Sequence, residues 1–223
     1  METTRSDSDR RLSAALRGRT FIAAVIVVLI LLSGNLLGAG LVFVWAALSK
    51  TPLQALGFRR PTTLIGTFVG ATVGGVSLKL AMKALVMPLL GFGATNDRFA
   101  YLIGNRQALV EMLLFVVVGG GFGEETIWRG FLFERLNCLM RPAKWGGAIL
   151  LAISTILFAL AHYADQGVAG VTQAAVTGLV FGSVFIIRGE IWSPMVVHAA
   201  FDVTAVLLIY WNLEALVAHA IFR

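Results

Sequence analysis

The sequence of 223 residues contains few charged side chains, a single cysteine and only three histidines. Charged residues make up 13% of the chain and hydrophobic residues 58%, whereas a soluble domain has about 25% charged and roughly 45–50% apolar residues. So few charges cannot cover a surface that faces water, which excludes an ordinary soluble domain, a disordered chain and a nucleic-acid-binding module. Cys138 alone cannot form an internal disulfide. The mean hydropathy of +0.84 indicates a polytopic membrane protein.

Long apolar segments follow one another along the chain. We expect helices over 21–48, about 62–90, 107–134, 145–163, 168–187 and 191–211, with hydrophilic loops at 94–106 and 135–144. At roughly 20 residues each, these segments are long enough to span a bilayer. The sequence therefore predicts an all-α, polytopic transmembrane bundle of about six to eight helices, in contact with the lipid bilayer of the cell (plasma) membrane. We expect a polar, basic N-terminal segment over 1–20 and a single transmembrane domain over 21–223.

The first apolar run, 21–48, follows an arginine-rich segment and contains 28 uncharged residues. It is much longer than the apolar region of a signal peptide, about 7–15 residues, so we expect it to be retained. As one helix it would measure about 42 Å, against a hydrocarbon core of roughly 30 Å. A steep tilt, or a break near Ser33-Gly34-Asn35, would allow a run of this length to fit within the bilayer. Basic flanks are typical of cytoplasmic ends, but a single crossing and a re-entrant or double crossing both remain open.

Ionisable residues inside the apolar segments are the informative ones. Each costs about 2.5–3.5 kcal/mol at membrane depth on insertion scales, and such residues usually face a bundle interior or a water-filled cavity. The set consists of Lys79, Lys83, Glu111, Glu124, Glu125, Arg129, His162, His198 and Asp202.

The densest group lies in the segment GGGFGEETIWRGFLFERL, residues 119–136. Glu125 and Arg129 are four residues apart, so on a helix they share a face and can form an ion pair. Glu124 is turned about 100° from Glu125 and is a candidate general base. The four glycines at 119, 120, 121 and 123 weaken the helix and leave room for a cavity or a substrate backbone. Taken alone, the pattern equally fits a juxtamembrane helix with a salt bridge.

Two further pairs are also spaced by four residues. Phe158 and His162 share a face near the end of the run 145–163, where a lone histidine is more often structural than catalytic. His198 and Asp202 share a face in the run 191–211, in a helix that we expect to be capped at Ser193-Pro194. Alone, this pair fits a buried hydrogen bond. Together, the three groups can activate a water molecule and stabilise an oxyanion.

The order EExxxR, FxxxH, HxxxN/D resembles the CPBP family of CAAX proteases and bacteriocin-processing enzymes, also called the Abi family. The motifs read Glu124 to Arg129, Phe158 to His162 and His198 to Asp202, and the polar segment ALGFRRP before them also resembles the family. The likeness covers about 53–210, which we take as the protease-like core. EExxxR alone is a weak signal, but the three motifs in order are a strong one.

This resemblance implies an all-helical intramembrane endopeptidase that acts on membrane-associated or lipidated peptides. By similarity, Glu124 and His162 activate the hydrolytic water, Glu125 and Arg129 pair to support the site or the substrate, and His198 and Asp202 stabilise the oxyanion. Prenyl-protein endopeptidases of the family carry Asn at the last position. An Asp is a poorer oxyanion donor, so its role can be limited to orienting His198.

Several alternatives remain beside this prediction. A metal-dependent protease is less favoured, because zinc-competent side chains are present but no HExxH motif is; we expect no cofactor. A non-enzymatic scaffold or immunity protein with the same fold would not need all three motifs, and a proton-coupled transporter would be supported by an inverted repeat that the sequence lacks. The expected partners are a peptide or membrane-protein substrate and lipid, without nucleic acid; the oligomeric state is left open.

Overall fold

A computed structural model describes residues 2–18, 21–140 and 145–222. All regular elements within these ranges are helices, which confirms the all-α prediction. The α-helices are α1 (Glu2–Arg17), α2 (Phe21–Leu32), α3 (Asn35–Ser49), α4 (Leu64–Ala81), α5 (Met87–Leu89), α6 (Arg106–Leu114), α7 (Leu132–Leu139), α8 (Gly146–Ala161), α9 (Tyr163–Arg188), α10 (Trp192–Tyr210) and α11 (Glu214–Ala218). The 3₁₀ helices are η1 (Leu53–Leu56) and η3 (Asp97–Leu102), and the π-helical stretches are η2 (Met82–Val86), η4 (Phe115–Glu124) and η5 (Thr126–Phe131).

Four helices in the described residues are long and apolar enough to cross a membrane: Leu64–Leu89, Arg106–Leu139, Tyr163–Arg188 and Trp192–Tyr210. The bent pair Asp7–Arg17 and Ile22–Leu32 makes a fifth candidate if it counts as one span. Helices α3 and α8 have only 15 and 16 residues. Our expectation that every apolar segment is long enough to span is therefore wrong for 145–163, which forms α8, whereas α3 is one part of the predicted run 21–48. The chain is an integral membrane protein whose apolar helices differ in length.

The run 21–48 is divided between α2 and α3, at the place where a break was predicted. Gly34 adopts a φ of +79° between the two helices, a conformation that favours glycine. The 12 residues of α2 rise about 18 Å, well short of the hydrocarbon core. Trp45 near the end of α3 donates a hydrogen bond to the carbonyl of Leu16 near the end of α1, over 3.3 Å. The end of the run therefore lies beside the end of α1, close to where the run begins. This arrangement supports the re-entrant alternative.

The segment Arg106–Leu139 forms one continuous helix of 34 residues, in which η4 and η5 are π-helical. Wide turns of this kind are often found at functional sites. The helix continues past residue 135, where a loop was predicted to start. Arg135 lies in α7 and is buried. Its side chain contacts Glu134, with Nε 2.5 Å from Oε2, and donates to the carbonyl of Arg17 over 2.9 Å. The remainder of that predicted loop, with Arg141 and Lys144, lies outside the described residues.

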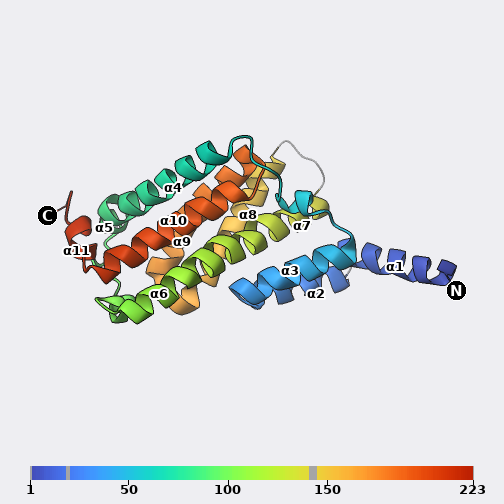
Figure 1. The fold of residues 1–223 in the computed structure, drawn as a ribbon, viewed down its shortest axis with the longest axis horizontal. Coiled ribbons are helices and arrows are strands. Elements are labelled where there is room, and N and C mark those ends of the chain that lie inside the picture. Colours follow the sequence, from blue (N-terminus) through green and yellow to red (C-terminus); the bar gives the residue numbers. More distant parts are fainter. Residues whose placement is uncertain (1, 19–20, 141–144, 223) are drawn as a thin grey trace.

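Helix α10 is the central helix of the bundle. It packs against α4 on one side and η4 on the other, and it also contacts α9, as Figure 1 shows for α4, α10 and α6 running side by side. Half of its apolar window is buried, more than in the other three spans. Gly75 of α4 makes the close approach possible, because a Cβ there would lie 2.3 Å from the carbonyl oxygen of Val197. Small residues commonly allow such backbone contact between membrane helices.

Candidate active site

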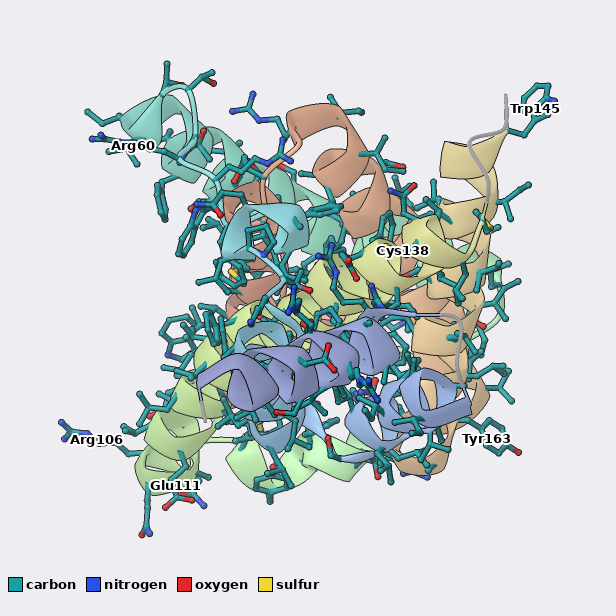
Figure 2. The ribbon with its side chains drawn as sticks, turned by 90° about the vertical axis from the view of Figure 1, so that its right-hand side faces the viewer. Arg60, Arg106, Glu111, Cys138, Trp145 and Tyr163 are labelled. Atoms are coloured by element: carbon teal, nitrogen blue, oxygen red, sulfur yellow. The ribbon has the colours of Figure 1, made fainter. Side chains whose placement is uncertain are left out.

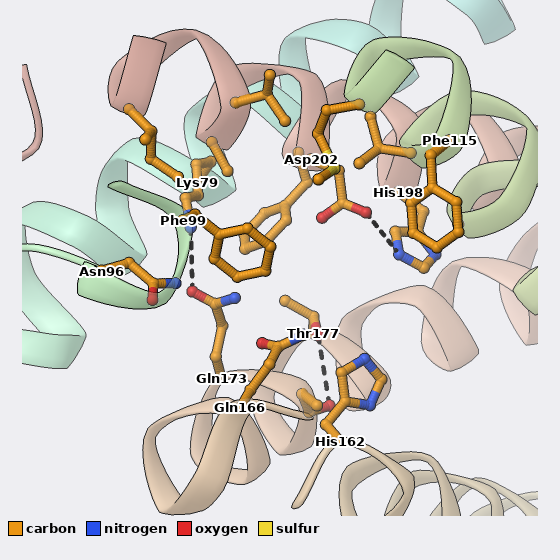
Figure 3. A pocket seen from close by; sticks show the side chains of 18 of the residues that line it. Lys79, Asn96, Phe99, Phe115, His162, Gln166, Gln173, Thr177, His198 and Asp202 are labelled. Carbon is orange, nitrogen blue, oxygen red and sulfur yellow. Dashed lines mark hydrogen bonds and ion pairs between the residues drawn. The ribbon is translucent and has the colours of Figure 1, made fainter. Parts of the chain in front are cut away.

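A cavity of about 180 Å³ lies within the bundle and is lined by residues from α4, α6, η4, α8, α9 and α10. Four of the six predicted site residues line it: Glu124, His162, His198 and Asp202. They come from η4, from the residue after α8, and from α10. Figure 3 shows His198 and Asp202 on one wall of the cavity and His162 on the opposite wall. The three motifs therefore meet around one space, as the sequence indicated.

The other two predicted site residues, Glu125 and Arg129, lie behind the cavity wall. Their side chains form the predicted ion pair, with Arg129 Nη1 2.8 Å from Glu125 Oε1, and neither residue is exposed to solvent. The guanidinium also lies over the ring of Phe158, 4.4 Å from its centroid, and donates to the carbonyl of Gly178 over 3.3 Å. A buried, aromatic-covered ion pair of this kind supports neighbouring groups and does not contact a molecule in the cavity.

His198 connects this pair to the cavity. Its Nδ1 lies 2.7 Å from Glu125 Oε1, and its Nε2 lies 3.2 Å from Asp202 Oδ2 and 3.9 Å from Glu124 Oε2. The ring is stacked on Phe181 at 4.7 Å. Each ring nitrogen thus faces a carboxylate oxygen, so the orientation of the imidazole is held from both sides, with Nε2 directed to the cavity.

The imidazole of His162 is oriented by the last turn of the helix that precedes it, α8. Helix α8 ends at Ala161, and Nδ1 of His162 lies 2.8 Å from the carbonyl oxygen of Phe158. A carbonyl oxygen only accepts, so Nδ1 is the donor, and in the neutral ring Nε2 is left as a proton acceptor. The imidazole packs edge-on against the Phe158 ring at 4.6 Å. The predicted FxxxH spacing therefore orients a ring nitrogen that can accept a proton.

Glu124 has a free oxygen inside the bundle. Its Oε2 is buried and has no hydrogen-bond partner among the described residues. Buried polar oxygens are normally hydrogen-bonded, so this oxygen is available to a molecule that enters the cavity. A carboxylate oxygen beside a cavity and 3.9 Å from an imidazole nitrogen is suited to hold and deprotonate a water molecule.

The glycines before Glu124 have a different role from the one predicted. Instead of leaving space, the run is packed against neighbouring helices, because a Cβ at Gly121 would lie 2.8 Å from Ala199 Cβ and one at Gly123 would lie 2.8 Å from the Asn35 carbonyl oxygen. Only Gly120 borders the cavity, where a Cβ would lie 3.0 Å from Asp202 Oδ2. The glycines let η4 approach α10 and α3 closely, and this proximity brings Glu124 and Glu125 to His198.

Two sequence expectations around the site are corrected. The cap of α10 is not Ser193 but Glu190, whose Oε2 accepts hydrogen bonds from the backbone N–H groups of Trp192 and Ser193 at 2.7 and 3.1 Å. The helix begins at Trp192 and has no side-chain cap from its preceding residue. Glu111 is exposed on α6, accepts a hydrogen bond from Gln107 over 3.1 Å, and projects away from the bundle in Figure 2. It takes no part in the site.

The sequence did not predict the polar groups that line the far side of the cavity. They include the uncharged amides of Asn96, Gln166 and Gln173, together with Lys79 and Glu214. Lys79 stood among the ionisable residues at membrane depth, but its spacing connected it to no motif. Within the ranges 2–18, 21–140 and 145–222, no three His, Cys, Asp or Glu side chains are grouped so that they could hold a metal ion.

Comparison with known proteins is consistent with this geometry. Residues 106–204 match the family model described as Type II CAAX prenyl endopeptidase Rce1-like. This segment is similar to that family. The match covers somewhat less than half of the chain, contains all six predicted site residues and confirms the resemblance to CAAX proteases. No curated protein and no solved structure matches the chain. The Rce1-like family is a family of membrane proteases, so the match supports peptide hydrolysis as the general activity.

Proposed function

We propose that the protein is an intramembrane endopeptidase of the glutamate type, which cleaves membrane-associated or lipidated peptides. The observation that carries this proposal is the shared cavity: Glu124, His162 and His198 come from three separate elements and line one space. Ionisable groups at membrane depth are energetically costly, and those that occur usually belong to a functional site. A structural ion pair would need only Glu125 and Arg129. It does not account for the ionisable side chains that line the cavity.

In the proposed reaction, Glu124 and His162 hold a water molecule and accept its proton as the oxygen attacks the peptide carbonyl carbon. One C–O bond forms, and the carbonyl oxygen becomes an oxyanion. When the C–N bond breaks, the accepted proton is transferred to the departing amine. The products are a new carboxyl end and a new amino end, and one water molecule is consumed.

The supporting roles follow from the contacts around His198. Its Nε2 is directed to the cavity, where an N–H can stabilise the oxyanion. Asp202, 3.2 Å from Nε2, is a hydrogen-bond acceptor when ionised, so we assign it to orienting the ring. Glu125 fixes the opposite nitrogen at 2.7 Å, and Arg129 keeps Glu125 paired. These two are positioning residues, because neither lines the cavity.

The test is a cleavage assay with the purified full-length protein in detergent or vesicles. A library of membrane peptides is incubated with the wild type and with Glu124→Ala, and products are identified by mass spectrometry. We expect defined cleavage by the wild type and none by the variant. A wild type that cleaves no member of the library, or a variant that cleaves as well as the wild type, would contradict the proposal. Retention of the fold in Glu124→Ala is checked by its thermal melt.

The same assay decides the role of metal ions. Because Glu124 and His162 are assigned to activate the water without a Lewis acid, we expect the rate to be unchanged after incubation with a strong chelator and its removal. Loss of activity that is restored by added zinc would favour the metal-dependent alternative, in which some of the same side chains act as ligands.

A further inference from the structure

The two ends of the helical bundle differ in charge. At one end, Trp45 of α3 and Arg135 of α7 both donate hydrogen bonds to carbonyl oxygens in the last turn of α1. Arg188 of α9 donates to the hydroxyl of Thr67, near the start of α4, over 2.8 Å. We call this the basic end. The basic residues that the structure describes there are Arg10, Arg11, Arg17, Lys50, Arg59, Arg60, Arg135 and Arg188.

The opposite end is formed by the other ends of the same spans. Glu214 of α11 contacts Lys83 Nζ at 2.6 Å and accepts the backbone N–H of Asn96 over 3.0 Å. Gly104 donates its backbone N–H to the carbonyl of Tyr210, the last residue of α10, over 3.1 Å. Figure 1 shows α5 and α11 at the left of the bundle and α7 toward the right. Among the described residues of this end, the exposed charged side chains are Arg98, Arg106, Asp97, Glu111 and Asp165.

The cavity extends from the proposed hydrolytic groups toward the opposite end. Its lining residues lie within 112–124 of the helix Arg106–Leu139, within 166–181 of α9 and within 198–209 of α10. None of its lining residues belongs to α1, α3, η1 or α7, the elements that form the basic end. Glu124 therefore lies at the inner end of a space that leads away from the basic residues.

The basic end is closed by packed side chains. Past Glu124, the same helix continues into a buried hydrophobic cluster that includes Trp45, Leu56, Phe131 and Leu132. These four residues are at most 4% exposed, so no water-filled path leads through them. A peptide cannot reach the hydrolytic groups from this side.

The opposite end is open. Asn96 lines the cavity and is exposed at the surface. A second hollow of about 110 Å³ shares five lining residues with the cavity and is bordered by the exposed residues Gly93 and Thr95. The apolar side chains of Phe99 and Leu102 line the same part of the cavity. Water and an apolar stretch of peptide can therefore enter here.

We propose that the cavity opens on the side of the membrane that faces away from the cytoplasm, and that the substrate is a membrane-bound peptide presented on that side. This inference rests on the proposed function. Lys and Arg near the ends of membrane spans are retained on the cytoplasmic side, and here they gather at the closed end of the bundle. The basic end is then cytoplasmic, and the protein acts on exported peptides.

The first test labels single cysteines in intact cells that express the full chain. Ala55 of η1 lies at the basic end and Ala100 of η3 at the opposite end; both are exposed and neither lines the cavity. Each is changed to cysteine in a Cys138→Ser background, which leaves one thiol in the chain. We expect a membrane-impermeant maleimide to label Ala100→Cys in intact cells, and Ala55→Cys only after the membrane is permeabilised.

The two alanines are a matched pair, because the same substitution is made at two exposed positions in short helical turns. Labelling of Ala55→Cys in intact cells would overturn the proposed orientation. So would an Ala100→Cys that is labelled only after permeabilisation. If neither variant accumulates in the membrane, the orientation is decided with the wild type as follows.

The second test measures cleavage by the wild type in sealed membrane vesicles, either right-side-out or inverted. A membrane peptide that the wild type cleaves in detergent is given a charged tag that cannot cross the bilayer, and it is added outside the vesicles. We expect cleavage by right-side-out vesicles and none by inverted vesicles until detergent opens them. Cleavage by sealed inverted vesicles would overturn the inference and assign the substrate to the cytoplasmic side.

The two proposals fail in different ways. If the wild type cleaves no peptide even in detergent, the proteolytic function itself fails. If it cleaves in detergent, Glu124→Ala does not, and sealed inverted vesicles also cleave, the proteolytic function stands and the sidedness is refuted.

Discussion

At the residue scale, the site depends on a series of buried contacts that runs from Arg129 through Glu125 to His198. The oxygen Oε1 of Glu125 contacts both partners, at 2.8 Å from Arg129 Nη1 and 2.7 Å from His198 Nδ1. Both members of the ion pair are fully buried. Removing one charge from such a pair is far more costly than replacing both, because the remaining charge stays buried and unpaired.

We therefore predict that Arg129→Ala lowers both stability and activity. The loss of stability should be about 3–5 kcal/mol, as for other broken buried pairs, and it should appear as a lower midpoint in a thermal melt in detergent. Glu125→Ala should show a similar loss, since it strands the guanidinium and releases His198. Melts that match the wild type for both variants would contradict the pairing.

His162 and His219 provide a matched comparison for activity. His162 lines the cavity, whereas His219 is exposed after α11 and does not. We predict that His162→Ala lowers kcat by about 10²-fold or more, the usual contribution of a general base, and that His219→Ala leaves it unchanged. Each rate is measured on the same cleaved peptide. An inactive, folded His219→Ala would mean that the site has been assigned to the wrong part of the molecule.

At the element scale, the sequence predicted what depends on local spacing and missed what depends on neighbouring helices. The pairing of Glu125 with Arg129 and the break near Gly34 follow from residues close in the chain. The π-helical turns of η4 and η5 do not, because apolar periodicity does not distinguish them from an α-helix. The role of the glycines was also not predicted, because it depends on tertiary contacts with α10 and α3.

Two adjacent glycines of α4 test the importance of helix contact. A Cβ at Gly75 would lie 2.3 Å from the Val197 carbonyl oxygen, whereas a Cβ at Gly74 meets nothing within 4 Å. We predict that Gly75→Ala separates α4 from α10, lowers the melting midpoint and reduces cleavage, since Lys79 and His198 are then displaced. Gly74→Ala should melt at or slightly above the wild type, because alanine is the better helix former. Identical melts for the two variants would refute this packing.

At the scale of the whole molecule, the fold encloses charged groups within a bundle whose outer surface is apolar. Arg60 and Trp145 lie in the upper part of the view in Figure 2, and Arg106, Glu111 and Tyr163 in the lower part. The composition predicted this all-helical membrane class, but it did not predict that α8 would fall short of a span. Nor did it associate Lys79 with the cavity, because that depends on how α4 packs against α9 and α10.

The central claim is that Glu124 and His162, from different helices, act on one water molecule in one cavity. A double-mutant cycle tests it most directly, with residual single-turnover cleavage measured for Glu124→Gln, His162→Gln and the double variant. Residues that act as a unit are strongly non-additive. We predict that the double variant loses no more activity than the worse single variant. Losses that multiply would show that the two residues act independently, and would contradict the shared site.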